Sequence, residues 1–389
     1  MLEKPTPSPQ PEDDAPAGCV LVADDQPDVL AALRLLLKMN GFAVTTASSP
    51  ADVLAALASP DPRRFDALVM DLNYARDTTS GREGLELVAR VRALDPTLPV
   101  VVMTAWSTVP LAVETMRNGV SDFVEKPWDN ARLIATIRAQ VVSGRHLRRA
   151  QRLENDARDV QRRLLARAVP DVPGYTVGVA WHFAERLGGD AYEMSALPGG
   201  RLGVAIADVC GKGTPAALVM ASAQATLRDL MAIPLPPDEV CARLDRALAP
   251  RLAPDRFVSL AYVILDQRNH TLSYANAGHP PPLLLRADDG VERLPPGGPV
   301  LGMLADARYE MGSAVLDAGD RLVLYTDGIV EAACGSGEMG EERLLAALRG
   351  MRGLAAADAA RAVLKAAMDF SGDSPLDDDA TVVVVDVSG

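Results

Sequence analysis

Residues 19–25 read CVLVADD, a short apolar run that ends in two aspartates. A run of this length, bounded by polar residues, is typical of a strand that is buried on both faces. Similar runs follow at 42–47, 65–72, 98–104 and 120–127, with amphipathic helical segments between them. Five strands that alternate with five helices predict a parallel sheet covered on both faces, an α/β architecture.

Polar residues stand where these strands end. Asp24 and Asp25 follow the first strand, Asp71 ends the third, Thr104 ends the fourth and Lys126 ends the fifth. In a doubly wound sheet of flavodoxin-like order, these strand ends converge on one edge. Three carboxylates around one lysine predict a Mg²⁺ site with a counter-charge, which a phosphoryl group would complete.

This constellation resembles the response-regulator receiver domain over about residues 19–142. Four motifs in receiver-like order carry the resemblance: ADD (23–25), VMDL (69–72), VMTA (102–105) and FVEKPWD (123–129). It implies that Asp71 accepts a phosphoryl group from an upstream histidine kinase. It also implies supporting roles: Mg²⁺ held by Asp24, Asp25, Asp71 and the Asn73 carbonyl, phosphoryl contacts from Thr104 and Lys126, and a rotamer switch at Phe123.

Two other interpretations of these residues stay open. Asp24 and Asp25 would cap a helix while Lys126 is only a surface charge, or the receiver would be degenerate and unphosphorylated. The loop at 73–84, NYARDTTSGREG, is also a few residues longer than in the shortest receivers. A longer loop would alter access to the site or the rate of dephosphorylation.

The segment from 143 to 169 has no proline and no glycine after Gly144, which favours a helix. It contains eight arginines and three acidic residues. Three roles are open for the expected linker at 143–168: a solvated helix packed on a neighbouring domain, the seam of a homodimer, or nucleic-acid binding by the arginines. The seam would use apolar residues at the spacing of a short coiled coil, namely Ala150, Leu153, Ala157, Val160 and Leu164.

From Pro170 onward the pattern changes to glycine-punctuated strands joined by short turns. This predicts largely antiparallel sheets with helices packed against them, an α+β sandwich domain over 169–389. The expected strands lie at 175–183, 201–209, 257–266, 271–278, 281–287, 321–328 and 380–387, and the expected helices at 214–232, 237–249, 341–350 and 357–370.

Aspartates again stand beside these strands. Asp190, Asp208, Asp327 and the pair Asp378 and Asp379 lie at strand ends or starts, mostly beside glycine, where carbonyl and carboxylate oxygens can approach an ion together. The chain has only four histidines and four widely scattered cysteines, so oxygen ligands are expected. Four such loops suggest two hard cations bridged by a carboxylate and a water.

These loops resemble the PPM-type Ser/Thr protein phosphatases, in particular the bacterial SpoIIE branch, over about 169–389. The motifs are GGDAYE (188–193), ADVCGKGTPAALVMA (207–221), YANAGHPPPLLL (274–285), GGPVLGM (297–303), LYTDGIVEA (324–332) and DDAT (378–381). The resemblance implies that Asp208 bridges two Mn²⁺ or Mg²⁺ ions, that the Val209 carbonyl binds one, and that Asp327 and Asp378 bind the other. Asp190 would orient the waters on the metals. The implied reaction is hydrolysis of phosphoserine or phosphothreonine in a protein.

Several positions depart from the family's common pattern. Ala191 and Glu193 stand where an aromatic residue and an aspartate are frequent, and Lys212 stands where histidine is common. Lys212 is interpreted either as a surface lysine at a helix start or as a cation beside the metals that attracts the substrate phosphate. We interpret His279 as a structural turn residue rather than a leaving-group acid. Asp379 is expected beside the metal site, in contact with its waters or ligands.

The composition narrows the classes of function. An apolar share of 48% with few aromatics indicates a globular protein, and a net charge of −13 argues against general binding to nucleic acid or anionic membranes. No apolar stretch approaches the roughly 20 residues that span a bilayer. The first 18 residues are polar and proline-rich, which predicts a flexible tail rather than a signal peptide and makes the cytoplasm the expected location.

Together these features predict a response regulator whose phosphorylation at Asp71 controls a protein phosphatase. By analogy with the SpoIIE branch, the expected substrate is a phosphorylated anti-sigma-factor antagonist. The rival hypothesis is a receiver-controlled adaptor that binds a partner without catalysis, a pseudophosphatase. The matched metal aspartates are all present, which favours the enzyme.

Overall fold

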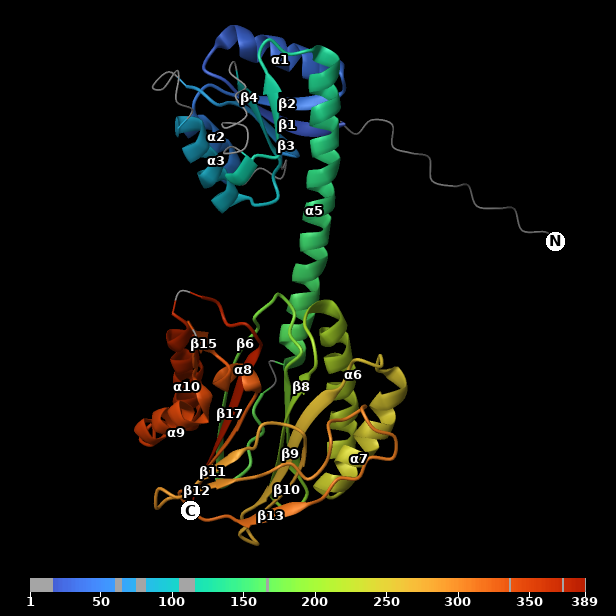
Figure 1. Cartoon of the computed structure of the whole chain (residues 1–389), viewed down its shortest axis with the longest axis vertical. Coiled ribbons are helices and arrows are strands. Elements are labelled where there is room, and N and C mark those ends of the chain that lie inside the picture. The colour runs from blue at the N-terminus through green and yellow to red at the C-terminus, as the bar shows by residue number, and fades with distance from the viewer. Residues whose placement is uncertain are drawn as a thin grey trace, which may run out of the picture. The chain divides into compact units, whose positions relative to one another are not determined.

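The computed structural model describes residues 17–59, 65–74, 82–104, 116–165, 168–335, 337–372 and 374–388. The chain divides into two compact units, Met1–Leu153 and Glu154–Gly389. A parallel sheet forms the centre of the first unit and antiparallel sheets form the centre of the second (Figure 1).

The first unit contains five parallel strands: β1 (Gly18–Ala23), β2 (Phe42–Ala47), β3 (Ala67–Asp71), β4 (Val100–Thr104) and β5 (Asp122–Glu125). Their order in the sheet is β2-β1-β3-β4-β5. This is the flavodoxin-like order, so the predicted fold of this half is confirmed. The carboxyl ends of β1, β3, β4 and β5 therefore lie next to one another on one edge.

Helices cover both faces of this sheet: α1 (Pro27–Met39), α2 (Pro50–Ala58), α3 (Arg82–Leu94) and the beginning of α5 (Asn130–Leu165). Alternate residues of β1 explain the two cores, because Leu21 packs with α2 and α3 whereas Val20 packs with α1 and α5. The helical segment expected between the strands at 98–104 and 120–127 falls largely on 105–115, which lies outside the described residues.

Helix α5 is a single helix of 36 residues. It combines the fifth of the helices expected in the first half with most of the expected linker at 143–168. Its residues through Leu153 belong to the first unit and the rest to the second. None of the described helices combines the length and the apolar content that crossing a membrane requires.

The second unit contains two five-stranded antiparallel sheets with the orders β13-β10-β9-β8-β7 and β12-β11-β14-β17-β6. Side chains from both sheets meet in one core, so the predicted sandwich is confirmed. The first sheet consists of β7 (Ala191–Leu197), β8 (Arg201–Val209), β9 (Val258–Asp266), β10 (Thr271–Ala277) and β13 (Gly312–Val315). The second consists of β6 (Tyr175–His182), β11 (Leu283–Leu285), β12 (Val291–Arg293), β14 (Arg321–Tyr325) and β17 (Ala380–Val387).

Helices pack on the outer faces of this sandwich (Figure 1). Those against the first sheet are α6 (Gly213–Met231) and α7 (Pro237–Leu248), followed by the short η1 (Ala249–Arg251); those against the second are α8 (Asp327–Val330), α9 (Gly340–Gly350) and α10 (Ala356–Ser371). A small ribbon pairs β15 (Ala333–Cys334) with β16 (Gly337–Glu338). The predicted long helices are present. The elements that were not expected are β7, β12, β13, the ribbon of β15 and β16, and the short α8.

The valine run 382–385 in β17 reflects burial on both sides of the strand. Val383 and Val385 face the core between the sheets, and Val382 and Val384 face the core under α9 and α10. A strand between two apolar layers reads as a continuous apolar run rather than an alternating one. The acids just before it therefore stand at the mouth of a fully buried strand.

We expect Gly178→Ala to destabilise the second unit. A Cβ at Gly178 in β6 would lie 2.3 Å from the backbone of Ala356 at the start of α10. Overpacking of this kind costs about 1–3 kcal/mol, because the helix must move away from the sheet. Urea unfolding measures the loss. Gly350→Ala is the matched control, since its Cβ meets nothing within 4 Å; equal stabilities for the two variants would contradict the packing.

Candidate functional site

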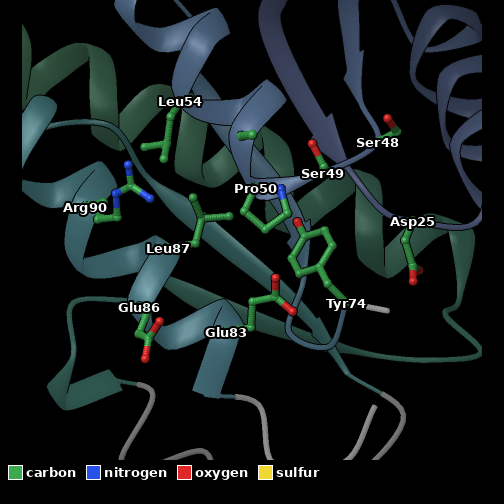
Figure 2. Close-up of a pocket in the computed structure, with 11 residues that line it drawn as sticks. Asp25, Ser48, Ser49, Pro50, Leu54, Tyr74, Glu83, Glu86, Leu87 and Arg90 are labelled. Atoms are coloured by element: carbon green, nitrogen blue, oxygen red, sulfur yellow. The ribbon is translucent and has the colours of Figure 1, made fainter. Parts of the chain in front are cut away.

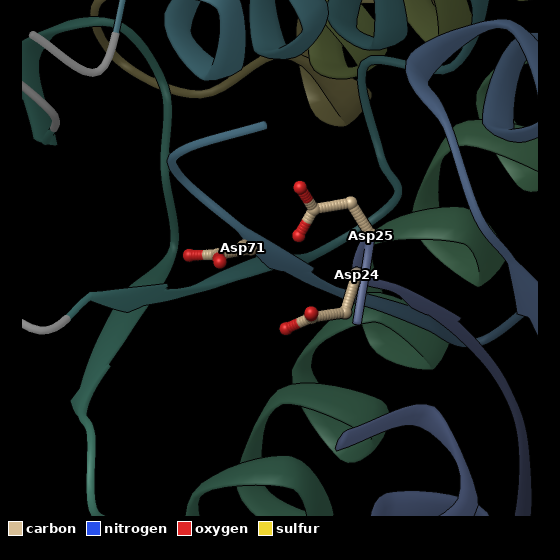
Figure 3. A group of neighbouring side chains, drawn as sticks. All are labelled: Asp24, Asp25 and Asp71. Carbon is tan, nitrogen blue, oxygen red and sulfur yellow. The ribbon is translucent and has the colours of Figure 1, made fainter. Parts of the chain in front are cut away.

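Three carboxylates meet at the edge of the first unit's sheet (Figure 3). Asp24 and Asp25 follow β1 and Asp71 ends β3, and each offers an oxygen within 4.8 Å of the others. Asp24 is fully buried, and Asp71 is nearly so. Within the part of the chain that the structure describes, this is the one group of three such ligands packed so closely. The sequence placed these three acids together, and the structure does the same.

Lys126 lies among these acids. Its Nζ is 2.7 Å from Asp24 Oδ2 and 2.8 Å from Asp71 Oδ2. Burial disfavours the charged lysine, but its hydrogen bonds to the two carboxylates and their charges raise its pKa. Burial raises the pKa of Asp71, and the hydrogen bond and charge of Lys126 oppose that rise. One ammonium among three carboxylates leaves negative charge that a divalent cation would neutralise.

The other predicted receiver residues lie at the same edge. Thr104 is buried at the end of β4, and its backbone carbonyl accepts a hydrogen bond from the backbone N–H of Lys126 at 2.8 Å. Asn73 donates its backbone N–H to Asp71 Oδ1 at 3.4 Å, and Phe123 is half-buried in β5. The structure thus brings the predicted residues together, while their roles in phosphorylation remain predictions.

A cavity of 570 Å³ opens beside the acids, between α2 and α3 (Figure 2). Tyr74 and Glu83 line it, and among the described atoms the Tyr74 hydroxyl and Glu83 Oε2 are buried without a hydrogen-bond partner. Asp25 belongs both to this lining and to the acid cluster. The cavity therefore adjoins the candidate cation site.

The aspartates of the second unit gather at one end of the sandwich. Asp208 is near the end of β8, and Asp190 directly precedes β7, its antiparallel neighbour, with Ala191 paired to Ala207. In the other sheet, Asp327 follows β14 and Asp379 precedes β17, its neighbour, with Tyr325 paired to Val382. Antiparallel pairing therefore brings these loops together in two pairs, one at the end of each sheet.

Asp190 joins the two sheets through hydrogen bonds. Its Oδ2 accepts from the Thr326 hydroxyl at 2.9 Å and from the Thr381 hydroxyl at 2.7 Å. Asp190 is 1% exposed, and its Oδ1 is buried with no hydrogen-bond partner among the described residues. A buried carboxylate oxygen without a donor is costly unless a cation or an ordered water satisfies it.

The three consecutive aspartates before β17 have different environments. Asp377 is exposed and Asp378 is half-buried, with its Oδ1 accepting the Asp379 N–H at 2.9 Å. Asp379 is 5% exposed, and its carboxylate accepts the N–H groups of Ala184 at 2.9 Å and Gly189 at 2.6 Å. Asp379 therefore holds the loop that leads to Asp190, and Asp378 is left facing the other acids.

Negative charge accumulates at this end of the sandwich. Burial, followed by the charges of Asp327, Asp378 and Asp379, raises the pKa of Asp208 to about 7. Burial and then the charge of Asp208 raise the pKa of Asp190, and burial and then Asp378 raise that of Asp327. Such mutual repulsion is relieved when cations bind between the carboxylates.

The unpartnered Asp190 oxygen and the oxygen-only donor set fit hard divalent cations. The Val209 carbonyl also lies in this region, 2.8 Å from where a Cβ on Gly189 would be. Glycine is thus needed at position 189, because a side chain there would displace that carbonyl.

Sequence reasoning missed Thr326 and Thr381, which fix Asp190. Each stands next to or near a quoted aspartate, in YTDG and DDAT, so the signal was a threonine inside a recognised motif. Lys212 precedes α6 at its N-cap position, as expected of a lysine at a helix start, and its Nζ donates to the Asp377 carbonyl. It therefore links the loop after Asp208 to the loop before Asp378.

His279 is buried and hydrogen-bonded at both ring nitrogens. Nδ1 lies 2.8 Å from the Ser259 hydroxyl, and Nε2 lies 3.1 Å from the Tyr325 carbonyl. Since a carbonyl only accepts, Nε2 carries the proton and Nδ1 accepts from Ser259. Burial lowers the pKa of His279 to about 3. This arrangement supports a structural role at the end of β14 rather than a role as leaving-group acid.

We expect His279 to make the second unit less stable in acid. Between about pH 6.5 and 3 the unfolded chain binds a proton at this histidine and the folded chain does not, so stability falls as pH falls. From pH 6.5 to 5 the loss is about 2 kcal/mol. The pH dependence of urea unfolding measures it against His279→Gln, whose change should be smaller by that amount. Parallel pH profiles would contradict a neutral buried imidazole.

Comparison with known proteins separates the two units in the same way. Residues 20–138 match the family model for the response regulator receiver domain, and residues 198–388 match the model for Stage II sporulation protein E (SpoIIE). The chain joins a receiver domain to a SpoIIE-family domain. The first of these contains the Asp24, Asp25 and Asp71 cluster, and the second contains Asp208, Asp327 and Asp378.

Individual relatives resemble one half or the other. The phosphoserine phosphatase RsbU of Bacillus subtilis is 31% identical over 182 residues, which are 46% of this chain and 54% of RsbU. The transcriptional regulatory protein FixJ of Azorhizobium caulinodans is 39% identical over 122 residues, which are 31% of this chain and 54% of FixJ. Against protein IcfG of Synechocystis, the match covers 34% of the relative. The chain thus spans about a third to a half of these curated relatives.

A solved structure supports the fold of the SpoIIE-family domain. The crystal structure of the RsbU and RsbW domains of a Mycobacterium tuberculosis protein matches with a TM-score of 0.51 at 26% identity, over 57% of this chain and 62% of that one. The SiaA-PP2C domain of Pseudomonas aeruginosa matches with a TM-score of 0.54 at 21% identity, over 61% and 97%. The second likeness concerns the fold alone.

Proposed function

We propose that this chain is a response regulator whose receiver domain controls a metal-dependent phosphoserine/phosphothreonine protein phosphatase. The observation that carries the proposal is the environment of Asp190: Thr326 and Thr381 donate to one carboxylate oxygen, and the other is buried without a donor among the described residues. Burial and then the charge of Asp208 raise the pKa of Asp190, and burial and then the charges of nearby acids raise that of Asp208. A site of this kind requires cations.

Residues of the second unit would have different roles in the proposed reaction. Asp208, the Val209 carbonyl, Asp327 and Asp378 would hold Mn²⁺ or Mg²⁺, and Asp190 would orient water. The bound cations would activate water and neutralise charge on the phosphoryl group. Water oxygen forms a bond to phosphorus as the bond from phosphorus to the serine or threonine oxygen breaks. His279 is not the acid that protonates the leaving oxygen, because both its nitrogens are engaged.

The receiver domain would supply the control. Asp71 would attack the phosphoryl donor, with a histidine kinase as the proposed source, and Lys126 would pair with the transferred group. Mg²⁺ at Asp24, Asp25 and Asp71 would reduce the charge that an added phosphoryl group brings. Thr104 and Phe123 would then change their contacts and alter the receiver surface.

We propose that residues 143–168 link the domains and pair two chains into a homodimer. Leu153 and Val160 of the expected seam are 62% and 57% exposed, although both are large and apolar. A coiled-coil seam with a second copy would cover them. Light scattering in both phosphorylation states tests this: a dimer mass in either state is expected, and a monomer mass in both states at micromolar concentrations would contradict it.

The proposed substrate is a phosphorylated anti-sigma-factor antagonist. Support comes from the similarity to RsbU of Bacillus subtilis, a phosphoserine phosphatase by name. The phosphoproteomes of cells that lack the protein and of cells that carry its Asp378→Asn form, each compared with that of wild-type cells, would reveal the substrate. A phosphoserine or phosphothreonine site that accumulates in both supports the proposal, and an unchanged phosphoproteome contradicts it.

Hydrolysis of p-nitrophenyl phosphate separates the enzyme from the rival adaptor. We expect the full-length protein to hydrolyse it in Mn²⁺ and to stop when EDTA is added. The adaptor hypothesis predicts rates no higher than those of a buffer blank in either condition. Equal rates with Mn²⁺ and EDTA would remove the metal-dependent phosphatase from consideration.

A further inference from the structure

Gln161, near the end of α5, makes two hydrogen bonds to the backbone of Gly188 in the loop that leads to Asp190. Gln161 Oε1 accepts the Gly188 N–H at 3.1 Å, and Gln161 Nε2 donates to the Gly188 carbonyl at 2.7 Å. Gln161 is 4% exposed. Both backbone polar groups of Gly188 are therefore satisfied by the helix, and removing the amide would leave them buried without these partners.

Gly188 is two positions from Asp190 in the sequence. Between them, Gly189 donates its N–H to Asp379 Oδ2 at 2.6 Å and lies against the Val209 carbonyl. A Cβ on Gly188 would come within 2.2 Å of the Phe183 ring, so that glycine has little room to move. A displacement of Gly188 therefore passes to Asp190 through a short, closely packed piece of backbone.

Other contacts place the same face of α5 on this part of the molecule. Glu154 lies 3.4 Å from Arg186 in the same loop, and the Leu165 carbonyl accepts the Tyr192 hydroxyl at 2.7 Å. Positions 154, 161 and 165 share one helix face because they are separated by whole turns. The pair of Glu154 and Arg186 is exposed and contributes little stability, whereas Gln161 is buried and makes two hydrogen bonds to the loop.

We propose that Gln161 is a positioning residue for Asp190 and the point at which helix α5 acts on the candidate metal site. Its amide fixes the backbone of Gly188, and the loop carries that position to Asp190. Rotation of α5 would move Gln161 together with the exposed seam residue Val160, its neighbour in sequence. Pairing of α5 with the same helix of a second copy would thus change the position of Asp190. This inference rests on the proposed phosphatase function of the same site.

The test compares Gln161→Met, which keeps a side chain of similar length without the two hydrogen bonds, with the full-length wild type. Arg163→Ala is the matched control, since it removes an exposed side chain two residues along the same helix. Gln161→Glu retains the acceptor for the Gly188 N–H and lacks the donor. Hydrogen exchange of the 183–190 segment, calorimetric Mn²⁺ binding, and kcat and KM for p-nitrophenyl phosphate are measured for all four proteins.

For Gln161→Met we expect exchange at Gly188 and Gly189 to be at least about tenfold faster in the metal-free protein. Mn²⁺ affinity and kcat should fall about 10- to 100-fold, the usual loss when a residue that orients a metal site is removed, while KM stays within about twofold. Gln161→Glu should be intermediate, and Arg163→Ala should match the wild type.

Two results would overturn the inference. Unchanged exchange in Gln161→Met would show that the glutamine does not hold the loop. Faster exchange with unchanged Mn²⁺ affinity and kcat would leave Gln161 with a merely structural role. Failure of the proposed function is distinguishable, because a wild type that hydrolyses nothing removes the phosphatase while exchange and Mn²⁺ binding still decide whether Gln161 positions the loop.

Discussion

Asp208→Asn is expected to lower Mn²⁺-dependent hydrolysis of p-nitrophenyl phosphate by more than about 100-fold. Loss of a residue that only orients a metal ligand typically costs 10- to 100-fold, and Asp208 is proposed as a ligand shared by both ions. The change also removes the carboxylate whose pKa is raised to about 7 by burial and by Asp327, Asp378 and Asp379. Initial rates at saturating Mn²⁺ measure the effect.

Asp377→Asn is the matched control for this variant. It removes the same charge from an exposed carboxylate next to the site, one residue before Asp378. We expect its rate to stay within about twofold of the wild type, because an exposed charge near a metal site acts through screened, long-range forces. Equal losses in the two variants would show that net charge matters rather than a specific ligand.

Asp71→Asn is expected to abolish the response of the phosphatase to the phosphoryl mimic beryllofluoride. In the wild type, beryllofluoride with Mg²⁺ should change the rate about 5- to 150-fold, the usual range of coupling between two sites. The variant lacks the carboxylate that accepts the mimic, so its ratio of rates with and without beryllofluoride should be one. Its basal rate should remain, because Asp71 is outside the SpoIIE-family domain.

Asp28→Asn serves as the control for the receiver variant. Asp28 is an exposed acid in the first turn of α1, close in sequence to Asp24 and Asp25. We expect it to respond to beryllofluoride as the wild type does. A wild type that does not respond would remove the switch and leave an unregulated phosphatase; a response that persists in Asp71→Asn would place the mimic elsewhere.

Local sequence signals were sufficient wherever function coincides with a strand end. CVLVADD and VMDL each show an apolar run that stops at an acid, and a parallel sheet brings such ends together by topology alone. The cluster of Asp24, Asp25 and Asp71 could therefore be predicted before the structure was seen. The strand order β2-β1-β3-β4-β5 is the flavodoxin-like order that the resemblance to the receiver domain implied, since alternation alone predicts a parallel sheet without its order.

Contacts between distant segments carried no such signal. Asp190 meets Thr381 across 191 positions, and neither residue's neighbours indicate the other. Gln161 lies within an arginine-rich helix whose apolar spacing predicted only a coiled-coil seam, so nothing in the sequence indicated that its amide would bind another segment. Strand β7 was missed because AYEMSAL mixes polar and apolar residues without clear alternation. Side-chain hydrogen bonds between loops depend on the packed sheets and are specified only in three dimensions.

Phosphate release from a phosphoserine peptide by the full-length protein tests the central claim most directly. The reaction is followed in Mn²⁺ with and without beryllofluoride, and EDTA gives the background. We predict release well above the EDTA background, with a rate that changes at least about fivefold when beryllofluoride is added. Release at the EDTA background in both conditions would contradict a receiver-controlled protein phosphatase.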